Sequence, residues 1–426
     1  MGTISGAGAL ILTNVTEVDR TKYVADFLGS FAEHVNVYKL GQEQDTLVPM
    51  ATGEGMTANW ARLHPFSVVT AAGSEAPHTI TVDQIRAQNI EATLAQWYKV
   101  IRISRATWRQ GRTGTMPGSV ALLGQNAAET LERQTCSVLC ETGCYVIPGN
   151  AYSADAGTWD AYLLQERIAV TSTSSTTTLV TTNITHNAAK TSTDVFKGSF
   201  VCVTKGRNYG YAGRVSGSST ATARVLTVTP TMPETPTSDA NDVTSFTIGQ
   251  PFPDAADYVA QAATIKLDTY ILRKAVTVLR INNAPTFEDG LYRAIIHPDV
   301  EMQLMEDTNW AAVMQYQKAQ KGERNELGVW GGCRFAYSTL LPRLSNTAET
   351  VNTYDPASGD VRATFVFGKG AFGKVALEGE TEPNFTTKQP GFYDAIDSYG
   401  TMAWHYWWKV KPLNANWAIM ILTFLS

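Results

Sequence analysis

The sequence predicts an α+β protein with more than one lobe. Three observations lead to this class. The 426 residues exceed the roughly 250–300 residues at which a single hydrophobic core stops growing. Several segments space their apolar residues as amphipathic helices do, and a long Ser/Thr-rich region between them shows only short β-like runs.

The charge composition limits the classes of partner. Charged residues make up 17% of the chain and apolar residues 44%, whereas about a quarter of the residues are charged in an average globular protein. The low share of charged residues indicates either that other chains cover much of the surface or that the chain is a charge-poor, β-rich monomer. The net charge is −5, and no run of Lys and Arg reaches four residues, so the electrostatic pattern of a nucleic-acid-binding protein is missing.

Five cysteines are present, at Cys136, Cys140, Cys144, Cys202 and Cys333. Their odd number and wide spacing do not indicate a disulfide framework. The first three recur every four residues on one predicted helix, but structural zinc needs a fourth ligand and closer pairs. Buried small apolar side chains are the favoured interpretation, so neither a metal site nor a cofactor is expected.

Targeting and membrane segments are not expected either. The first residues lack the basic and apolar regions of a signal peptide. The longest apolar run, Trp417–Leu422, is far shorter than the ~18 residues that span a bilayer. We therefore expect a soluble protein that folds in a reducing cytoplasm.

The N-terminal third is predicted to reach outward. Residues 1–20 are aperiodic apart from Leu10, Ile11 and Leu12, so they are expected to form an arm that is either loose or laid on another surface. A short helix over residues 22–37 follows. Residues 46–70 and 79–104 then flank a polar loop and predict a long hairpin. Since a lone two-stranded hairpin is marginally stable in water, it is expected to lie across a neighbouring subunit.

A long helix and a β-rich lobe come next. Thr115 is a candidate cap, Pro117 suits a first turn, and an apolar stripe predicts a helix from Pro117 to about Cys144. The stripe consists of Val120, Leu123, Ala127, Leu131 and Val138. Residues 150–262 lose the helical spacing and predict an all-β inserted lobe.

The last part of the chain alternates helices and strands. A helix is predicted over residues 267–281, a buried strand over 291–296, and a helix opened by Pro298. Further strands are predicted over residues 328–339, 364–367, 402–410 and 417–424, with a turn around residues 412–416.

Three patterns resemble catalytic or binding motifs, and each has a simpler explanation. Residues 368–375 fit the kinase glycine loop, but no catalytic or metal-binding kinase motif follows, so a strand turn is favoured. His297 and Asp299 flank Pro298, which indicates a helix start. The aromatic residues at 404 and 406–408 could stack on bases or sugars, but subunit or core packing is favoured because basic flanks are few. No catalytic residue is proposed.

Six segments, in order, resemble the major capsid proteins of tailed phages with the Hong Kong 97 fold, and within them the podovirus subfamily of coliphage N-four. They are EATLAQWYKVIRISR from Glu91, ALLGQNAAETLERQT from Ala121, YRAIIHPDV from Tyr292, LGVWGGCRFAYST from Leu327, FVFGKGAFGKVALEG from Phe365 and DSYGTMAWHYWWKVKPLN from Asp397. Residues 1–40 and 150–262 lie outside this resemblance.

The resemblance implies a Hong Kong 97-type α+β fold with an inserted all-β domain. It divides the chain into an N-terminal arm with its short helix (1–43), an E-loop (44–105) and a P-domain spine helix (106–149). The inserted β domain (150–262), an A-domain (263–364) and C-terminal strands that return to the P-domain (365–426) complete the division.

The implied function is assembly of an icosahedral virion shell around phage double-stranded DNA, in the bacterial cytoplasm. Partners are copies of the chain itself, as hexamers and pentamers, with scaffolding, portal and decoration proteins as further candidates. The DNA is enclosed without sequence-specific binding. The expected assembly contacts are Leu10, Ile11 and Leu12 in the arm and Glu75 and His78 at the E-loop tip.

Two alternatives stay open. A β-rich carbohydrate-binding or adhesive protein would also account for the Ser/Thr-rich lobe and the aromatic strand. A tail or portal subunit of a virion would also account for the long helix.

Overall fold

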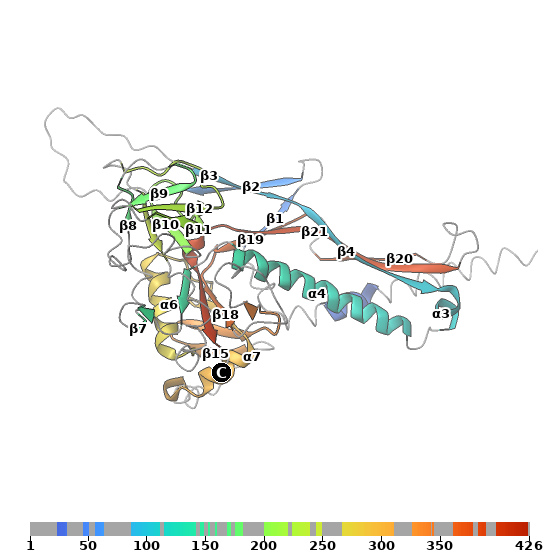
Figure 1. Cartoon of the computed structure of the whole chain (residues 1–426). Helices are drawn as coiled ribbons and strands as arrows, with labels where there is room; N and C mark the ends of the chain where they lie inside the picture. The colour runs from blue at the N-terminus through green and yellow to red at the C-terminus, as the bar shows by residue number, and fades with distance from the viewer. Residues whose placement is uncertain are drawn as a thin grey trace, which may run out of the picture. The chain divides into compact units, whose positions relative to one another are not determined.

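The computed structural model describes nineteen stretches of the chain (Figure 1). They are residues 24–31, 46–50, 56–63, 87–110, 115–141, 145–148, 152–153, 158–159, 168–171, 175–181, 200–219, 224–238, 244–248, 266–310, 326–341, 343–344, 361–377, 382–388 and 398–424. Helices and several sheets both occur in them, so the predicted α+β class is confirmed.

The chain folds into two compact units, each assembled from three separate segments. Unit 1 contains residues 1–58, 93–135 and 374–410, and unit 2 contains residues 59–92, 136–373 and 411–426. Neither unit is continuous in the sequence, because segments from near both ends of the chain contribute to each.

Unit 1 is built around a long central strand, β21 (Tyr399–Pro412). Strand β4 (Ala95–Ser104) pairs with it antiparallel over ten residues, from Tyr399 opposite Ser104 to Trp408 opposite Ala95. The remaining strands of this sheet are β20 (Asn384–Lys388), which also pairs with β21, and β19 (Phe372–Leu377) and β1 (Thr46–Met50).

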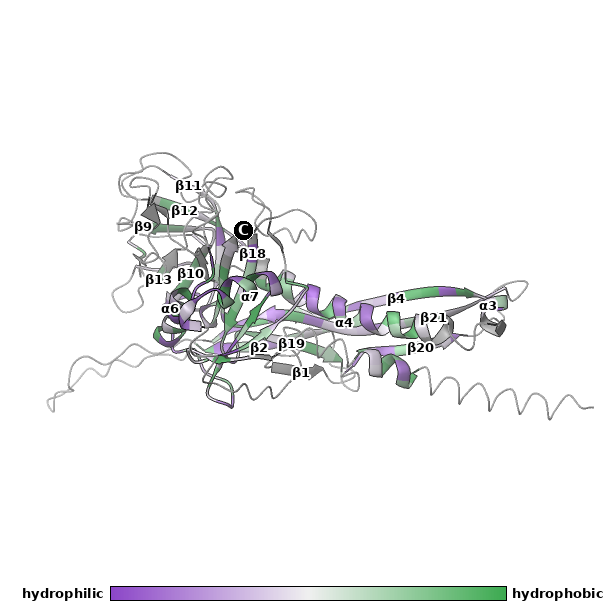
Figure 2. Cartoon of the chain, turned by 90° about the horizontal axis from the view of Figure 1, so that it is seen from below, coloured by the Kyte–Doolittle hydropathy of each residue, from purple (hydrophilic) through white to green (hydrophobic). Residues whose placement is uncertain are grey.

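One long helix, α4 (Thr115–Glu141), runs alongside this sheet (Figure 1). Bands of hydrophobic and hydrophilic residues along α4 show its two-sided character (Figure 2). The predicted helix is confirmed, with two differences. Thr115 is the first helical residue rather than the cap, and Val138 is only half-buried, while Cys136 and Leu139 are buried in its place. The short helix α3 (Arg105–Gln110) follows β4.

A second helical segment, residues 24–31, packs closely on α4. The Ser30 hydroxyl donates to the Ala121 carbonyl over 2.8 Å. Gly124 permits this approach, because a Cβ atom there would lie 2.8 Å from the Phe27 carbonyl oxygen and 3.0 Å from the Phe31 nitrogen. The predicted helix over residues 22–37 is confirmed for residues 24–31, and the rest of it lies outside the described residues.

Strands β2 (Thr57–Leu63) and β3 (Ala87–Thr93) form a two-stranded sheet. The Thr57 and Thr93 hydroxyls lie 3.4 Å apart at one end, and the Arg62 side chain donates to the Gln88 amide oxygen further along. Only this part of the long hairpin predicted over residues 46–70 and 79–104 is confirmed, because β1 pairs with β19 and β4 pairs with β21 in another sheet. Its polar loop at residues 73–79 lies outside the described residues.

Unit 2 has a seven-stranded mixed sheet in the order β15-β16-β14-β18-β22-β5, with β17 paired to β18. Its strands are β15 (Glu326–Trp330), β16 (Cys333–Tyr337), β14 (Tyr292–Ile296), β18 (Val361–Phe367), β22 (Ala418–Phe424), β5 (Tyr145–Pro148) and β17 (Arg343–Leu344). The pairs β14–β16 and β22–β5 are parallel and join segments distant in sequence.

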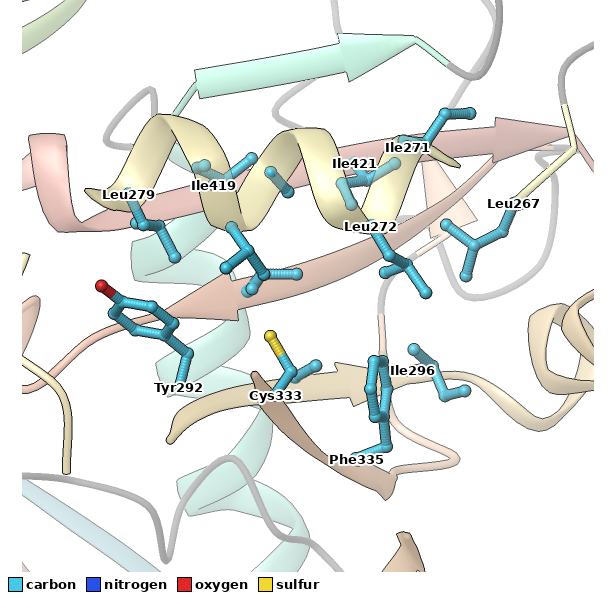
Figure 3. Packing of buried hydrophobic residues seen from close by; sticks show 14 of the residues in the cluster. Leu267, Ile271, Leu272, Leu279, Tyr292, Ile296, Cys333, Phe335, Ile419 and Ile421 are labelled. Carbon is cyan, nitrogen blue, oxygen red and sulfur yellow. The ribbon is translucent and has the colours of Figure 1, made fainter. Parts of the chain in front are cut away.

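Two helices, α6 (Thr269–Ile281) and α7 (Pro298–Met305), cover one face of this sheet. Leu272 and Leu279 of α6 and Val300 of α7 lie in one core with strand residues such as Phe335 and Ile419 (Figure 3). Asp268 caps α6 by accepting from the Ile271 amide over 2.8 Å, a standard way to satisfy a free helical N–H.

The region predicted to be all-β, residues 150–262, contains a six-stranded antiparallel sheet in the order β8-β13-β10-β11-β12-β9. Its strands are β8 (Ile168–Ala169), β13 (Ser245–Ile248), β10 (Phe200–Lys205), β11 (Ala212–Ser218), β12 (Arg224–Thr229) and β9 (Thr178–Thr181). The Thr171 amide donates to the Val180 carbonyl over 3.0 Å, and the Thr181 hydroxyl donates to the Ala169 carbonyl over 3.0 Å. These bonds join the two outer strands, so the sheet closes into a small barrel, here called the β-barrel.

The β-barrel has its own core and also shares a strand with the main core. Val201 and Val203 of β10 point into the barrel with Leu226 and Phe246. Cys202, between them, belongs instead to the core under α6. Strand β10 is therefore buried on both faces, which explains its continuous apolar sequence. Two short strands, β6 (Tyr152–Ser153) and β7 (Thr158–Trp159), pair nearby in sequence.

One predicted strand is wrong in form. Residues 328–339 were expected to form a single strand, but β15 and β16 form an antiparallel hairpin. Gly331 and Gly332 have φ values of 61° and 92° and make the turn between them. Glycine adopts these angles without steric cost, so the Gly-Gly pair was the turn signal. The turn after β21 is confirmed and ends in a 3₁₀ turn, η2 (Ala415–Trp417).

Candidate interaction surface

The two faces of the unit 1 sheet differ sharply in burial. Side chains alternate along β21, so Met402, Trp404, Tyr406 and Trp408 point to one face and are at most 1% exposed. This inner face packs on helices: the Trp404 indole nitrogen donates to the Asn126 side chain of α4 over 3.3 Å. The aromatic block is thus mainly core, as favoured by its sequence, and only Trp407 points the other way.

The opposite face of the same sheet is here called the outer sheet face. Its members follow from the register of β4, β21 and β20, since directly paired residues share a face. They are Gln96, Tyr98, Val100, Arg102, Ser104, Asn384, Thr386, Lys388, Tyr399, Thr401, Ala403, His405, Trp407 and Lys409.

The outer sheet face exposes large apolar side chains. Tyr98 is 66% exposed and Val100 is 49% exposed, and Ala403 and Trp407 beside them on β21 are half-buried. Within the described part of the chain, β4 pairs with β21 alone, so its other edge offers unpaired backbone groups. An apolar face beside an open strand edge is a typical protein–protein contact surface.

The charges on the outer sheet face have one sign. Arg102, Lys388 and Lys409 are basic, and none of the face's members is acidic. The Arg102 guanidinium lies 4.7 Å from the centre of the Tyr399 ring, a cation–π contact that holds the side chain flat on the sheet. The face therefore favours a partner segment that is apolar and carries carboxylates.

The hairpin of β2 and β3 is the second candidate surface. Met56 just before it is 48% exposed and Leu63 at the end of β2 is 63% exposed. Asn59, Ala61, Ala87 and Asn89 are exposed as well. A two-stranded ribbon with so little cover gains stability when another surface packs on it.

A buried guanidinium holds the hairpin to the rest of unit 2. Arg62 of β2 donates to the Gly210 carbonyl over 2.9 Å and to the Leu413 carbonyl over 2.8 Å, besides its bond to Gln88. Burial lowers the pKa of Arg62 to about 10, while Tyr209 and Cys202 oppose that shift. Arg62 thus joins the hairpin, the β-barrel loop and the C-terminal turn, three parts far apart in sequence.

The expected assembly residues cannot be placed on either surface. Leu10, Ile11, Leu12, Glu75 and His78 lie outside the described residues. The two surfaces were not predicted as such, and β20 was not predicted as a strand, although the residues of β2, β3, β4 and most of β21 were. Two sequence patterns predict strands of the outer sheet face: the alternation from Val100 to Ile103 and the aromatic residues after residue 402. No local sequence pattern predicts that these two strands pair with each other.

The other two motif-like patterns take the structural roles expected of them. Gly368–Ala371 make the turn between β18 and β19, and a Cβ atom on Gly368 would lie 2.6 Å from the Pro285 carbonyl. His297 is the N-cap of α7, with Pro298 in the first turn. Asp299 accepts from Arg362 over 3.0 Å. These residues build turns and helix ends.

No group of three or more His, Cys, Asp or Glu side chains that could hold a metal ion occurs in the described part of the chain. None of the helices described there has the length and hydropathy needed to cross a bilayer.

Comparison with known proteins gives structural similarities but no sequence relatives. No family model matches the chain, and no curated protein matches its sequence. A capsid structure of cyanophage P-SCSP1u is 13% identical and aligns over 90% of this chain and 88% of its own, with a TM-score of 0.46. The capsid of Ralstonia phage GP4 is 11% identical over 90% of both chains, with a TM-score of 0.45.

A third similar structure is a virus-like particle from Pyrococcus furiosus. It is 9% identical and aligns over 95% of this chain and 98% of its own, with a TM-score of 0.41.

Proposed function

We propose that this chain is a phage major capsid protein with a Hong Kong 97-type fold, which self-assembles into an icosahedral shell around double-stranded DNA. The observation that carries the proposal is the outer sheet face, where Tyr98 and Val100 stand exposed beside an open strand edge. The described residues of a single copy leave this surface uncovered, and burial of apolar surface drives association. The chain acts as a structural protein in this proposal, not as an enzyme.

The finer assignments are also proposals. The segments from Glu91, Ala121 and Tyr292 that resemble the coliphage N-four subfamily form β3 and β4, the middle of α4, and β14 with the start of α7. This supports the division into arm, E-loop, spine helix, inserted domain, A-domain and C-terminal strands. Scaffolding, portal and decoration proteins are further partners, and assembly in the host cytoplasm before release in the virion is the proposed location.

Electron microscopy of the purified full-length chain tests the proposal. We expect polyhedral particles in negative stain. Tubes would indicate a tail component, and a small monodisperse species that stays small at high concentration would indicate an adhesive or sugar-binding protein. Either of the last two results would overturn the proposal.

One substitution tests the role of the outer sheet face. Tyr98→Glu places a carboxylate in a surface that assembly would bury, which costs several kcal/mol when it is unpaired. We expect at least about tenfold fewer particles from a chain whose circular dichroism is unchanged. Thr231→Glu, at an exposed position of the β-barrel, is the control and should assemble normally. Equal particle yields from both variants would exclude this face.

Deletion of residues 1–20 tests the proposed arm. The arm contains Leu10, Ile11 and Leu12, and many weak contacts of this kind sum to a stable shell. We expect soluble protein that does not form regular shells. Normal particles from the shortened chain would remove the arm from the assembly contacts.

A further inference from the structure

Helix α6 presents a basic outer stripe. Its exposed positions are Tyr270, Arg273, Thr277, Arg280 and Ile281, which recur at the spacing of one helix face. Tyr270 is 57% exposed and Ile281 is 46% exposed. Every charged residue within α6 is basic, since Lys274 is the third and no acidic residue occurs between Thr269 and Ile281. This stripe is called the α6 stripe below.

Helix α7 presents the opposite charge. Asp299 and Glu301 are its charged residues, and Glu306 follows at its end. Two apolar side chains stand out on it: Met302 is 68% exposed and Met305 is 56% exposed. Together, Glu301, Met302, Met305 and Glu306 are called the α7 stripe.

The two stripes adjoin where α6 begins and α7 ends. The Leu267 amide donates to the Gln303 side chain over 3.3 Å. The Thr269 amide and hydroxyl both donate to one oxygen of Asp307, over 2.9 Å and 2.7 Å. Both helices also bury their inner sides in the same core. One rigid part of unit 2 therefore carries a basic stripe, an acidic stripe and exposed Tyr and Met side chains.

We propose that the α6 stripe of one copy packs on the α7 stripe of a second copy. The inference rests on the proposed self-assembly and names a contact that serves it. Tyr270, Ile281, Met302 and Met305 would form the apolar centre, where burial supplies affinity. The arginines and glutamates would form the rim, where complementary charge sets orientation and speeds encounter.

The charges favour a second copy over other occupants. A nucleic acid or an anionic membrane would meet the α6 stripe well but would be repelled by the carboxylates beside it. Glu306 lies 3.5 Å from the Lys266 ammonium of the same chain, but a salt bridge between such exposed side chains is weak. A second copy can therefore still offer each stripe the opposite charge. Because the two stripes are different patches, pairing them between copies leaves each chain able to bind more neighbours, as a growing shell requires.

Charge exchange tests the contact. Arg273→Glu/Arg280→Glu makes both stripes acidic, and Glu301→Lys/Glu306→Lys makes both basic. Each double variant should yield at least about tenfold fewer particles than wild type, because like charges then face each other. An equimolar mixture of the two should restore assembly, since each variant supplies the charge that the other lacks. Unchanged thermal unfolding of each variant confirms that it folds.

The outcomes separate this inference from the proposed function. If wild type forms shells and both double variants form them equally well, or if the mixture does not recover, the α6–α7 contact is refuted and the capsid function stands. If wild type forms no particles, both the α6–α7 contact and the capsid function are refuted. Lys205→Glu, a charge reversal at an exposed position of β10, is the control and should leave the yield unchanged.

Discussion

At the scale of single residues, several charged groups are placed where water cannot fully solvate them. Lys374 of β19 lies over the inner face of the unit 1 sheet, with its ammonium 5.1 Å from the Tyr406 ring centre and 5.8 Å from that of Trp408. Burial lowers the pKa of Lys374 to about 8, and the nearby Glu382 only partly opposes this. The residue is basic in sequence yet close to neutral at mildly alkaline pH.

Lys374 should make stability depend on pH. An unfolded lysine titrates near 10.4, so between about pH 8 and 10 the unfolded chain binds more protons than the folded one, and stability rises with pH. Lys374→Met removes this contribution. At pH 7, Lys374→Met should have a higher free energy of unfolding than wild type. We expect this difference between the two proteins to decrease by on the order of 2–3 kcal/mol from pH 7 to pH 10.

Thermal unfolding followed by tryptophan fluorescence across this pH range measures the effect of Lys374. Lys99→Met, at an exposed position of β4, is the matched control and should run parallel to wild type. A difference between wild type and Lys374→Met that stays constant from pH 7 to pH 10 would contradict the prediction.

At the scale of elements, α4 illustrates how one glycine can decide a packing contact. Glycine inside a helix usually costs about 0.5–1 kcal/mol relative to alanine. Gly118 has nothing within 4 Å of a Cβ added there, whereas at Gly124 the backbone of residues 27 and 31 stands in the way. The same substitution should therefore have opposite effects at two positions six residues apart.

Gly118→Ala should stabilise unit 1 by about 0.5–1 kcal/mol, and Gly124→Ala should destabilise it by about 1–3 kcal/mol. The loss arises because the helical segment 24–31 must move away from α4. The midpoints of thermal unfolding of the two variants measure this contrast. If both rise together, the close approach at Gly124 is not as described.

Local sequence patterns predict elements better than pairings. The apolar spacing predicts α4 and α6, and the aromatic alternation predicts β21. Strand β11 has little local signal, because Ala212–Ser218 is rich in Gly and Ser, residues that are depleted in strands. The outer sheet face was missed for another reason. It needs β4 and β21 to pair across some three hundred residues of sequence, and side-chain periodicity carries no information about a distant partner.

At the scale of the whole molecule, the chain crosses repeatedly between its two units. Linear boundaries such as 263–364 describe stretches of sequence, while each compact unit takes segments from three places. Arg62 shows how such distant segments are held together, since its guanidinium binds the carbonyls of Gly210 and Leu413. The sequence around Arg62 does not predict this role, because its partners are backbone carbonyls, which every residue has.

Arg62→Ala should loosen the hairpin of β2 and β3. Each buried carbonyl that loses its donor costs about 1–3 kcal/mol, so we expect unit 2 to lose about 2–4 kcal/mol of stability. Amide hydrogen exchange in residues 57–63 and 87–93 should speed up more than in the seven-stranded sheet. Arg102→Ala, on the exposed face of β4, is the control. Unchanged exchange in the hairpin would show that Arg62 does not anchor it.

The double burial of β10 has a consequence for engineering. Val201 and Val203 face the core of the β-barrel, and Cys202 faces the core under α6. The β-barrel therefore supports the neighbouring core and cannot be removed as an independent domain. The Asn416 side chain donates to the Val203 carbonyl over 2.9 Å, which links β10 to the C-terminal turn. Deletion of residues 150–262 would expose the core under α6 to water. Peptides inserted between β12 and β13 would instead leave β10 in place.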